Sequence, residues 1–249
     1  MKKKLFVAFL SALAGTGVMA QSAFEGFYGQ LGTGYEGNQF SSLNSTTGDQ
    51  QPGRTPVTWS PGNQKANGLP LVVGLGFNVA VAPSWLLGLG ADYSALNLKS
   101  GNYNSLDVSA NTNGQTLNGS NLETSNRFNV FLSPGYVIDK DKLAYFKAGY
   151  SLVTIKQTMP NQVGPAPFTN LGWSASNPSS TASGYILGLG YKQIISNGLY
   201  GFVEGNYMSY GSTNFSVTGT TVGVNNGYQL SNSPKLNTMQ FLVGVGYKF

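Results

Sequence analysis

Apolar and polar residues alternate with a period of two over much of the chain, which predicts β-strands. The clearest case is the segment 69–91, LPLVVGLGFNVAVAPSWLLGLGA, in which Leu, Val and Phe fill one parity while Gly and Asn fill the other. The segment is long enough for a membrane-spanning helix, but Pro83-Ser84 interrupts it and each glycine weakens a helix by about 1 kcal/mol. A hairpin that turns at Pro83-Ser84 fits the pattern better.

The same two-faced pattern recurs in six other stretches, so eight strands are predicted. These stretches are GFYGQLGTGYEG (26–37), RFNVFLSPGYVI (127–138), AYFKAGYSLV (144–153), GYILGLGYK (184–192), LYGFVEGNYMSY (199–210) and QFLVGVGYKF (240–249). Phe202 and Met208 depart from the alternation. No remaining stretch outside the amino-terminal segment carries a capped helical stripe, which indicates an all-β protein.

The connections between these strands alternate in length. Short turns are predicted at Pro83-Ser84, 139–142 and 196–198, where turn-forming residues gather. Long segments rich in Ser, Thr, Asn, Gln and Gly separate the other strands, at about 38–68, 100–123, 159–182 and 211–236, and are interpreted as solvated, flexible coil. This arrangement predicts a closed antiparallel eight-stranded up-and-down transmembrane β-barrel with short periplasmic turns and four long extracellular loops.

The two faces of the strands decide between a soluble and a membrane barrel. A soluble, lipocalin-like barrel would place the apolar parity inside, yet the opposite parity holds too much Gly to form a solvated coat. With the apolar parity outside, about ten residues per strand match the apolar band of an outer-membrane barrel, roughly 25 Å tall. Aromatic residues then lie where interfacial girdles are expected. They are Trp85, Tyr136, Tyr191, Tyr247 and Phe249 near the short turns, and Tyr35, Tyr93, Tyr150, Tyr185 and Tyr207 further out.

The first twenty residues are predicted to be a cleaved secretory signal peptide. Three lysines precede the apolar run LFVAFLSALA, and small residues end the segment at Ala20. The barrel is then expected to occupy 21–249. Removing these lysines from the 14 basic residues leaves a net charge of +2 against the 9 acidic residues. Such a balance excludes nucleic acid, which requires a clustered basic face. Outer-membrane lipid is the partner that the outward apolar parity of the predicted barrel implies.

Six charged residues fall on the interior parity and form a predicted polar network in the lumen. A lone buried charge costs several kcal/mol, so these groups are expected to pair or to be hydrated. The expected pairs join Glu204 to Lys147 or Lys192, and Asp92 to Arg127 or Lys147. A structural plug is the favoured interpretation, and an ion path or gate is the alternative. The six residues are Asp92, Arg127, Lys147, Lys192, Glu204 and Lys248.

The composition gives no basis for catalysis. The chain has no His, so it lacks the usual general base, and it has no Cys, so it forms no disulfides. Asp139 and Asp141 are the only close acidic pair in the barrel, and a solvated turn is the expected role for both. No enzyme activity, cofactor or metal is therefore expected.

The strand sequences resemble the small eight-stranded outer-membrane β-barrels of Gram-negative bacteria. This porin-related family includes the OmpA-type transmembrane domain and the opacity proteins. The resemblance rests on GFYGQLGTGYEG, AYFKAGYS (144–151) and FLVGVGYKF (241–249). It implies an outer-membrane location, a monomer, and recognition by the barrel assembly machinery. The residues that resemble the family's assembly signal are Phe241, Val243, Val245, Tyr247 and Phe249.

Two functions remain open at the level of sequence. In the first, the barrel is a membrane anchor whose loops bind another cell, a matrix or a partner protein and support envelope integrity. In the second, it is a minor porin-like channel for small solutes. The first is favoured because side chains can fill an eight-stranded lumen completely.

Overall fold

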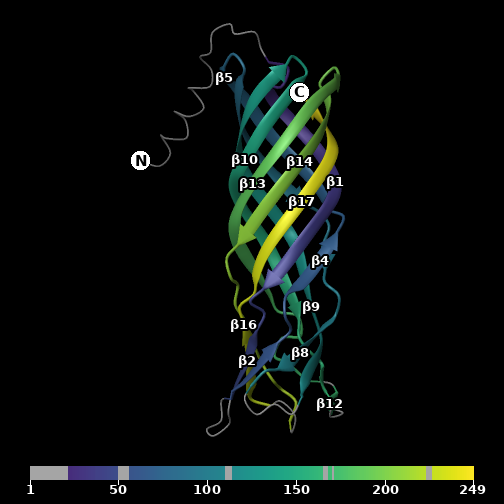
Figure 1. The fold of residues 1–249 in the computed structure, drawn as a ribbon, viewed down its shortest axis with the longest axis vertical. Coiled ribbons are helices and arrows are strands. Elements are labelled where there is room, and N and C mark those ends of the chain that lie inside the picture. Colours follow the sequence, from purple (N-terminus) through teal and green to yellow (C-terminus); the bar gives the residue numbers. More distant parts are fainter. Residues whose placement is uncertain (1–21, 50–55, 110–113, 165–167, 170, 223–225) are drawn as a thin grey trace, which may run out of the picture.

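The structure is an antiparallel β-sheet that curves into a tall column (Figure 1). The computed structural model describes residues 22–49, 56–109, 114–164, 168–169, 171–222 and 226–249. The predicted signal peptide lies outside these residues. Within them, no helix is long and apolar enough to cross a membrane. The all-β, antiparallel part of the fold prediction is confirmed.

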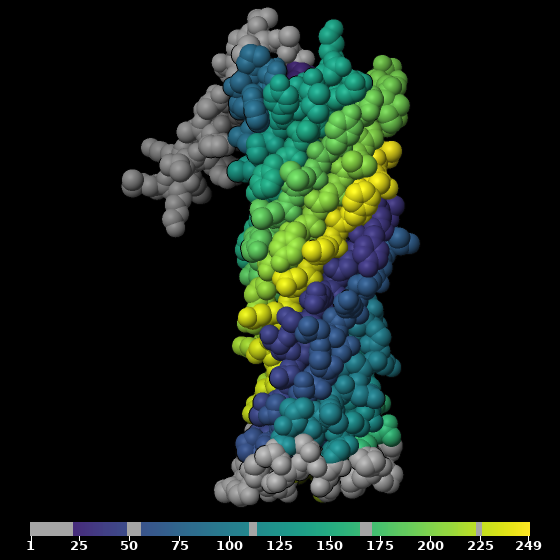
Figure 2. All heavy atoms as spheres, in the orientation of Figure 1, coloured from purple at the N-terminus to yellow at the C-terminus, as the bar shows by residue number. Residues whose placement is uncertain are grey.

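The wall of the column consists of long strands, each paired antiparallel with the next long strand along the chain. β17 pairs in turn with β1, from Tyr28 opposite Lys248 to Ser41 opposite Lys235. Figure 2 shows these two strands, yellow and purple, lying side by side along the column. The long strands are β1 (Gly26–Ser41), β5 (Leu71–Ala82), β6 (Trp85–Ser94), β9 (Thr116–Asp139), β10 (Lys142–Thr158), β13 (Ser179–Ser196), β14 (Leu199–Tyr210) and β17 (Lys235–Lys248).

Tight turns join the strands at one end of the column, where the sequence predicts them. β5 meets β6 at Pro83-Ser84, and β13 meets β14 at Asn197-Gly198. Asn197 and Gly198 both have positive φ, 38° and 85°, as a two-residue hairpin turn requires. A Cβ on Gly198 would lie 2.6 Å from the carbonyl oxygen of Lys248, so only glycine fits there.

The segments predicted as flexible loops contain further strands, so the coil interpretation is wrong for their described residues. These strands pair in the order β15, β16, β2, β3, β8, β9, β11 and β12. We call them, with the adjoining ends of the long strands, the outer region, which lies at the lower end of Figure 1. The short strands are β2 (Ser45–Asp49), β3 (Val57–Ser60), β4 (Gln64–Gly68), β7 (Leu98–Lys99), β8 (Tyr103–Asp107), β11 (Gln162–Gly164), β12 (Phe168–Thr169), β15 (Phe215–Thr218) and β16 (Tyr228–Asn232).

A seam at Trp173 connects the two ends of this outer sheet. Trp173 forms an isolated antiparallel bridge with Gly219. The amide of Ser174 donates to the carbonyl oxygen of Thr218 at 2.7 Å, and the indole Nε1 of Trp173 donates to the carbonyl oxygen of Pro160 at 2.6 Å. The seam satisfies backbone groups that an open edge would leave unpaired.

The outward face of the long strands is apolar, as the alternation predicts. Every predicted girdle residue is at least partly exposed on this face, from Tyr191 to Phe249, which is 75% exposed. Trp85 and Tyr136 lie on paired strands near the tight turns, with ring centroids 5.2 Å apart. Trp85 and Tyr93 lie eight residues apart on β6, which corresponds to roughly 20 Å along the membrane normal for a strand tilted by about 40°.

The interior has three layers. Near the tight turns it is mostly aromatic and apolar, with Tyr28, Tyr200 and Phe202 among the buried side chains. A polar network fills the middle, and a second apolar core fills the outer region. Phe202 and Met208 are apolar residues on the otherwise polar parity of β14, and both point inward and are buried. The polar layer therefore lies between two apolar ones.

Candidate functional site: the interior polar network

Lys147 is the centre of the half of the polar network that lies nearer the tight turns. Its side chain is fully buried on β10, and its Nζ lies 2.6 Å from Asp92 Oδ2 and 2.9 Å from Glu204 Oε1. Tyr145 donates its hydroxyl to Glu204 Oε2 at 2.6 Å, and Asn129 donates to Asp92. The ammonium group thus neutralises parts of two carboxylates whose remaining oxygens receive hydrogen bonds, as buried charges require.

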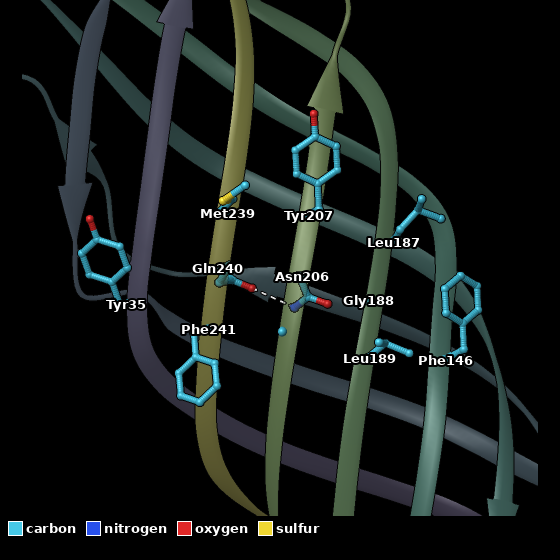
Figure 3. A pocket seen from close by; sticks show the side chains of 11 residues that line it. Tyr35, Phe146, Leu187, Gly188, Leu189, Asn206, Tyr207, Met239, Gln240 and Phe241 are labelled. Carbon is cyan, nitrogen blue, oxygen red and sulfur yellow. Dashed lines mark hydrogen bonds between the residues drawn. The ribbon is translucent and has the colours of Figure 1, made fainter.

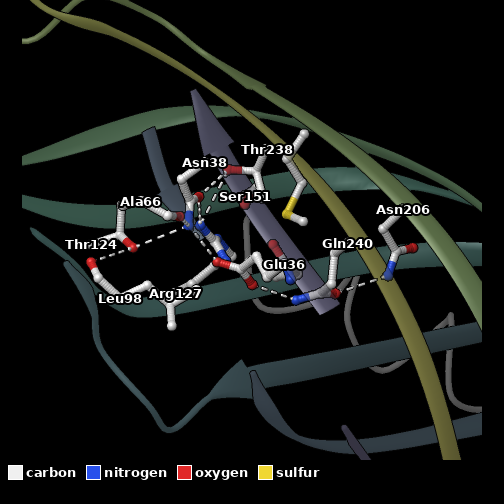
Figure 4. A network of polar contacts seen from close by, with 12 residues as sticks. Glu36, Asn38, Ala66, Leu98, Thr124, Arg127, Ser151, Asn206, Thr238 and Gln240 are labelled. Atoms are coloured by element: carbon white, nitrogen blue, oxygen red, sulfur yellow. Dashed lines mark hydrogen bonds and ion pairs between the residues drawn. The ribbon is translucent and has the colours of Figure 1, made fainter. Parts of the chain in front are cut away.

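Arg127 and Glu36 form the half of the network that lies nearer the outer region (Figure 4). Their side chains are ion-paired and only 2% exposed. Arg127 also donates from Nε to the Tyr210 hydroxyl at 2.9 Å and from NH2 to Asn38 Oδ1 at 2.9 Å. The guanidinium fork therefore holds β9 against β1 and β14 across the interior.

Two amides connect the halves. Gln240 on β17 donates to Glu36 Oε2 at 2.7 Å and accepts from Asn206 at 3.1 Å, while Asn206 also donates to Glu204 Oε1 at 2.7 Å. Figure 4 shows the contacts that join Glu36, Gln240 and Asn206 across the interior. The network is continuous from Asp92 to Arg127, and its members come from β1, β6, β9, β10, β14 and β17.

Lys192 is held by aromatic rings on the tight-turn side of the network. Its Nζ lies 3.8 Å from the ring centroid of Tyr28, 4.9 Å from that of Tyr200 and 5.2 Å from that of Tyr145. Each of these contacts is within the range of cation–π attraction. At the level of the network and the rings beside it, the described residues place three cations (Lys147, Arg127 and Lys192) and three carboxylates (Glu36, Asp92 and Glu204) inside the wall, so their formal charges balance.

The glycines of the repeated GLGY-type motif make room for these rings. A Cβ on Gly190 would lie 2.2 Å from the Tyr145 ring, and a Cβ on Gly246 would lie 2.3 Å from the Tyr200 ring. The wall glycines therefore allow the tyrosine rings to lie flat against neighbouring strands inside a narrow lumen.

The structure places the predicted network residues as follows. Asp92, Lys147 and Glu204 meet directly, whereas Arg127 pairs with Glu36, which the sequence-based set omitted. Glu36 shares the interior parity of Gln30, and this signal could have identified it. Lys192 has aromatic neighbours in place of the proposed carboxylate. Lys248 is half-buried at the turn end of β17, beside Gly26, and is outside the network.

The residues that resemble an assembly signal line the outward face of β17. Their exposed fractions range from 45% for Val243 to 75% for Phe249. The amide of Phe249 donates to the carbonyl oxygen of Phe27 at 2.9 Å, and the Tyr247 ring contacts the Phe249 ring at a centroid distance of 5.4 Å. The strand thus presents a continuous apolar outward face beside β1.

The network offers charge neutralisation between its buried cations and carboxylates. No group of three or more His, Cys, Asp or Glu side chains that could hold a metal occurs among the described residues. Asn129 Oδ1 and Asn206 Oδ1 are buried without a hydrogen-bond partner, so the layer also contains unsatisfied acceptors. These acceptors are compatible with one or two interior waters.

Comparison with known proteins gives one sequence match and several structural likenesses. No protein-family model matches the chain. The chain is 36% identical over 66 residues to the 25 kDa outer-membrane immunogenic protein of Brucella melitensis biotype 1, a match that spans 26% of each protein.

The structural likenesses cover almost the whole chain at low identity. The outer membrane protease OmpT of Escherichia coli is 12% identical with a TM-score of 0.49, over 92% of this chain and 98% of that one. Neisserial surface protein A is 13% identical with a TM-score of 0.38, over 90% and 98%. The attachment invasion locus protein Ail of Yersinia pestis is 13% identical with a TM-score of 0.37, over 90% and 99%.

These likenesses concern the fold. The sequence match is to an outer-membrane protein, and an exposed apolar wall is what a membrane requires. The predicted resemblance to outer-membrane β-barrel proteins and the predicted outer-membrane location are thereby confirmed.

Proposed function

We propose that the long strands form a closed eight-stranded barrel that anchors the outer region at the cell surface. In this proposal residues 21–249 form one unit, the tight turns face the periplasm, and the outer region binds another cell, a matrix or a partner protein. The barrel supports the envelope and performs no catalysis. It acts as a monomer, without a cofactor.

The filled interior is the observation that carries this proposal. Lys147, Ser151 and Thr238 are fully buried at mid-height, and apolar side chains close the column above and below them. A solute would have to displace paired charges and packed aromatic rings together. The interior network therefore acts as a structural plug, with Lys147 and Arg127 bracing the wall.

The packed outer region supports a role in binding. Its strands surround buried Phe40, Trp59 and Leu236. Its outward positions carry mostly polar side chains, with exposed Leu106 on β8 among the exceptions. A surface held in shape before binding loses little conformational entropy when a partner arrives. The relative from Brucella is described as immunogenic, which is compatible with surface exposure of that protein.

Liposome swelling distinguishes the anchor from the alternative, a porin-like channel. Vesicles that contain the purified protein should show no size-dependent uptake of graded sugars, and single-channel recordings should show no steady conductance. A matched preparation of Glu204→Gln, which weakens the plug, serves as the comparison. Steady, size-dependent uptake by the wild type that Glu204→Gln leaves unchanged would overturn the plug.

Adhesion is tested by replacing the outer region as a whole, because its four segments share one core. Cells that display the full chain should bind to a panel of matrix proteins and cell surfaces. Cells that display a chain with short Gly-Ser turns in place of the four segments should not. Heat-modifiable gel mobility verifies that the trimmed barrel folds, and equal binding by both chains would contradict the proposal.

We also propose that the apolar outward face of β17 directs recognition by the barrel assembly machinery. Phe241→Ser should slow assembly in the outer membrane. Leu189→Ser on β13 removes a similarly exposed apolar side chain and serves as the control. If both variants assemble at the same rate, β17 has no special role in recognition.

A further inference from the structure

A shallow groove lies in the membrane-facing wall at Gly205. This glycine occupies an outward position on β14, and a Cβ placed on it would have no heavy atom within 4 Å. Large apolar residues of β10, β13 and β17 surround the gap, among them Phe146, Leu187, Met239 and Phe241 (Figure 3). The groove has a volume of about 710 Å³ and is open to the membrane. Its size is within the range of about 300–1,000 Å³ that ligand sites occupy.

A second hollow continues the groove toward the outer region. It lies over Gly37, another outward-facing glycine, and has a volume of about 350 Å³. The two hollows share Tyr35, Tyr207 and Met239. Polar side chains line the second hollow, namely Gln39, Lys65, Asn67 and Asn237. The combined surface is therefore apolar at one end and polar at the other.

The change from apolar to polar coincides with the expected membrane boundary. Tyr35 and Tyr207 belong to the outer girdle, and the Tyr207 hydroxyl donates to Asn237 Oδ1 at 3.4 Å. The groove at Gly205 thus lies at the level of acyl chains, and Lys65 lies at the level of headgroups. Lys65 is exposed and makes no ion pair with any part of the chain that the structure describes.

We propose that this surface binds an outer-leaflet lipid with a phosphate-bearing headgroup, of the lipid A type. An acyl chain lies in the groove at Gly205, and the phosphate pairs with Lys65 while the amides of Asn67 and Asn237 are available to donate to it. The inference rests on the outer-membrane location and is independent of whether the outer region is adhesive.

A lipid fits this surface better than a second copy of the chain does. Among the described acidic residues near this level, Glu36, Asp92 and Glu204 point inside, and Glu123 accepts a hydrogen bond from Asn97 at 3.0 Å. The described part of a neighbouring wall therefore offers Lys65 no outward carboxylate that is without a hydrogen-bond partner at this level. Lipid is also present at every outward surface of the barrel and needs no separate partner.

Native mass spectrometry of the purified protein in dodecyl maltoside micelles tests the proposal. The probes are bisphosphorylated lipid A, dephosphorylated lipid A and inorganic phosphate. The wild type should bind bisphosphorylated lipid A about tenfold more tightly than the dephosphorylated form, because one charge-assisted contact is lost. Inorganic phosphate at the same concentration should not displace the lipid.

Two variants separate the ends of the site, and each has a matched control. Lys65→Gln should remove the phosphate preference, whereas Lys99→Gln should not. Gly205→Leu should weaken binding of both lipids, whereas Ala91→Leu, which places the same side chain at an outward position on β6, should not. Heat-modifiable mobility verifies folding, and Leu187→Trp narrows the groove from β13 if Gly205→Leu does not fold.

The proposal is overturned if Lys65→Gln and Gly205→Leu bind both lipids as the wild type does. It is also overturned if Ala91→Leu loses as much lipid as Gly205→Leu, since lipid would then coat the wall without a site. Neither result affects the swelling or adhesion assays, which test the anchor separately.

Discussion

The membrane-level wall and the outer region of this protein have opposite arrangements of polarity, although the same strands run through both. On β10, the inward face changes from Lys147 and Ser151 to Val153 and Ile155, all four of which are fully buried. The outward face changes from exposed Phe146 and Tyr150 to partly exposed Lys156. The surroundings, lipid or water, thus decide which face of a strand is apolar.

Because the two regions have opposite arrangements of polarity, different interactions stabilise them. In the outer region, water drives apolar side chains inward, at about 25 cal/mol per Å² removed from water. At the membrane level the lipid is as apolar as the wall, so burial of apolar groups contributes little. Paired strands, packed rings and the buried ion pairs hold that part of the molecule together.

A β-bulge at Asn126 accompanies the change on β9. The register with β10 shifts there, from Phe128 opposite Leu152 to Ser125 opposite Thr154, and Asn126 has a positive φ of 49°. Arg127 on the tight-turn side of the bulge and Leu122 on its outer side both point inward. In a regular strand, two residues at this odd spacing would face opposite sides. One extra residue on β9 therefore changes which residues of that strand, odd- or even-numbered, face inward in the two regions.

The largest effect is expected from removing the central cation of the wall. Lys147→Met leaves the carboxylates of Asp92 and Glu204 buried without their partner, which should cost about 3–5 kcal/mol of unfolding free energy. Urea unfolding in phospholipid vesicles measures this loss. The triple variant with Asp92→Asn and Glu204→Gln should recover most of it, and an unchanged midpoint for Lys147→Met would show that the network does not brace the wall.

A somewhat smaller effect is expected from a cavity in the outer core. Leu236→Ala truncates a fully buried side chain and should cost about 2–5 kcal/mol, whereas Leu189→Ala on the lipid face should cost much less. Trp59 and Trp173 lie in the outer region, so their fluorescence in a Trp85→Phe background follows its unfolding. Equal losses for both variants would remove the distinction between the regions.

The seam of the outer sheet provides a smaller, local test. Trp173→Phe removes the indole donor to Pro160 and should destabilise the seam by about 1 kcal/mol. Amide hydrogen exchange should then accelerate at Ser174 and Thr220, which donate across the seam, but not along β14 and β17. Unchanged exchange at both amides would mean that the backbone bonds alone hold the seam.

The smallest effect is expected at the turn between β9 and β10. The Asp139 carboxylate accepts from the Lys140 amide at 2.7 Å and lies 3.5 Å from Lys142 Nζ, and these contacts lower the pKa of Asp139 below its ordinary value of 3.8. Because the folded pKa is the lower one, the contribution to stability is present above the unfolded pKa and is lost as the pH falls through the folded pKa. Asp139 is fully exposed, so Asp139→Asn should change stability very little at neutral pH.

A carbon-detected NMR titration of Asp139 measures this pKa directly. A Lys142→Gln variant should move the pKa back toward its ordinary value, and the amide contact should retain part of the shift. A wild-type pKa at or above 3.8 would contradict the assignment.

The positions of the long strands and the inward or outward facing of their side chains were predictable because period two and turn chemistry are local signals. The hairpin at Pro83-Ser84, the turn at Asn197-Gly198 and the inward parity of Lys147 all follow from neighbouring residues. The pairing of Arg127 with Glu36 was not predictable in this way. It joins β9 to β1 across the interior, and the stagger and tilt of the whole wall decide which inward side chains reach each other.

The outer region escaped prediction for a different reason. Strands such as β7 and β12 contain two residues each, too few to show a period, and their Ser, Thr and Asn residues resemble coil. Their apolar residues, such as Phe215 and Leu230, are separated in sequence and meet only in the shared core.

The sequence by itself determined that the chain forms strands with one apolar and one polar face, and that the apolar face suits a membrane. Local alternation carries this information, because each residue's side of a strand depends only on its place in the strand. The tertiary structure alone decided the partners of the buried charges, the aromatic rings around Lys192 and the apolar core of the outer region. Each of these depends on which distant strands face one another across the interior, and no local pattern in the sequence determines that.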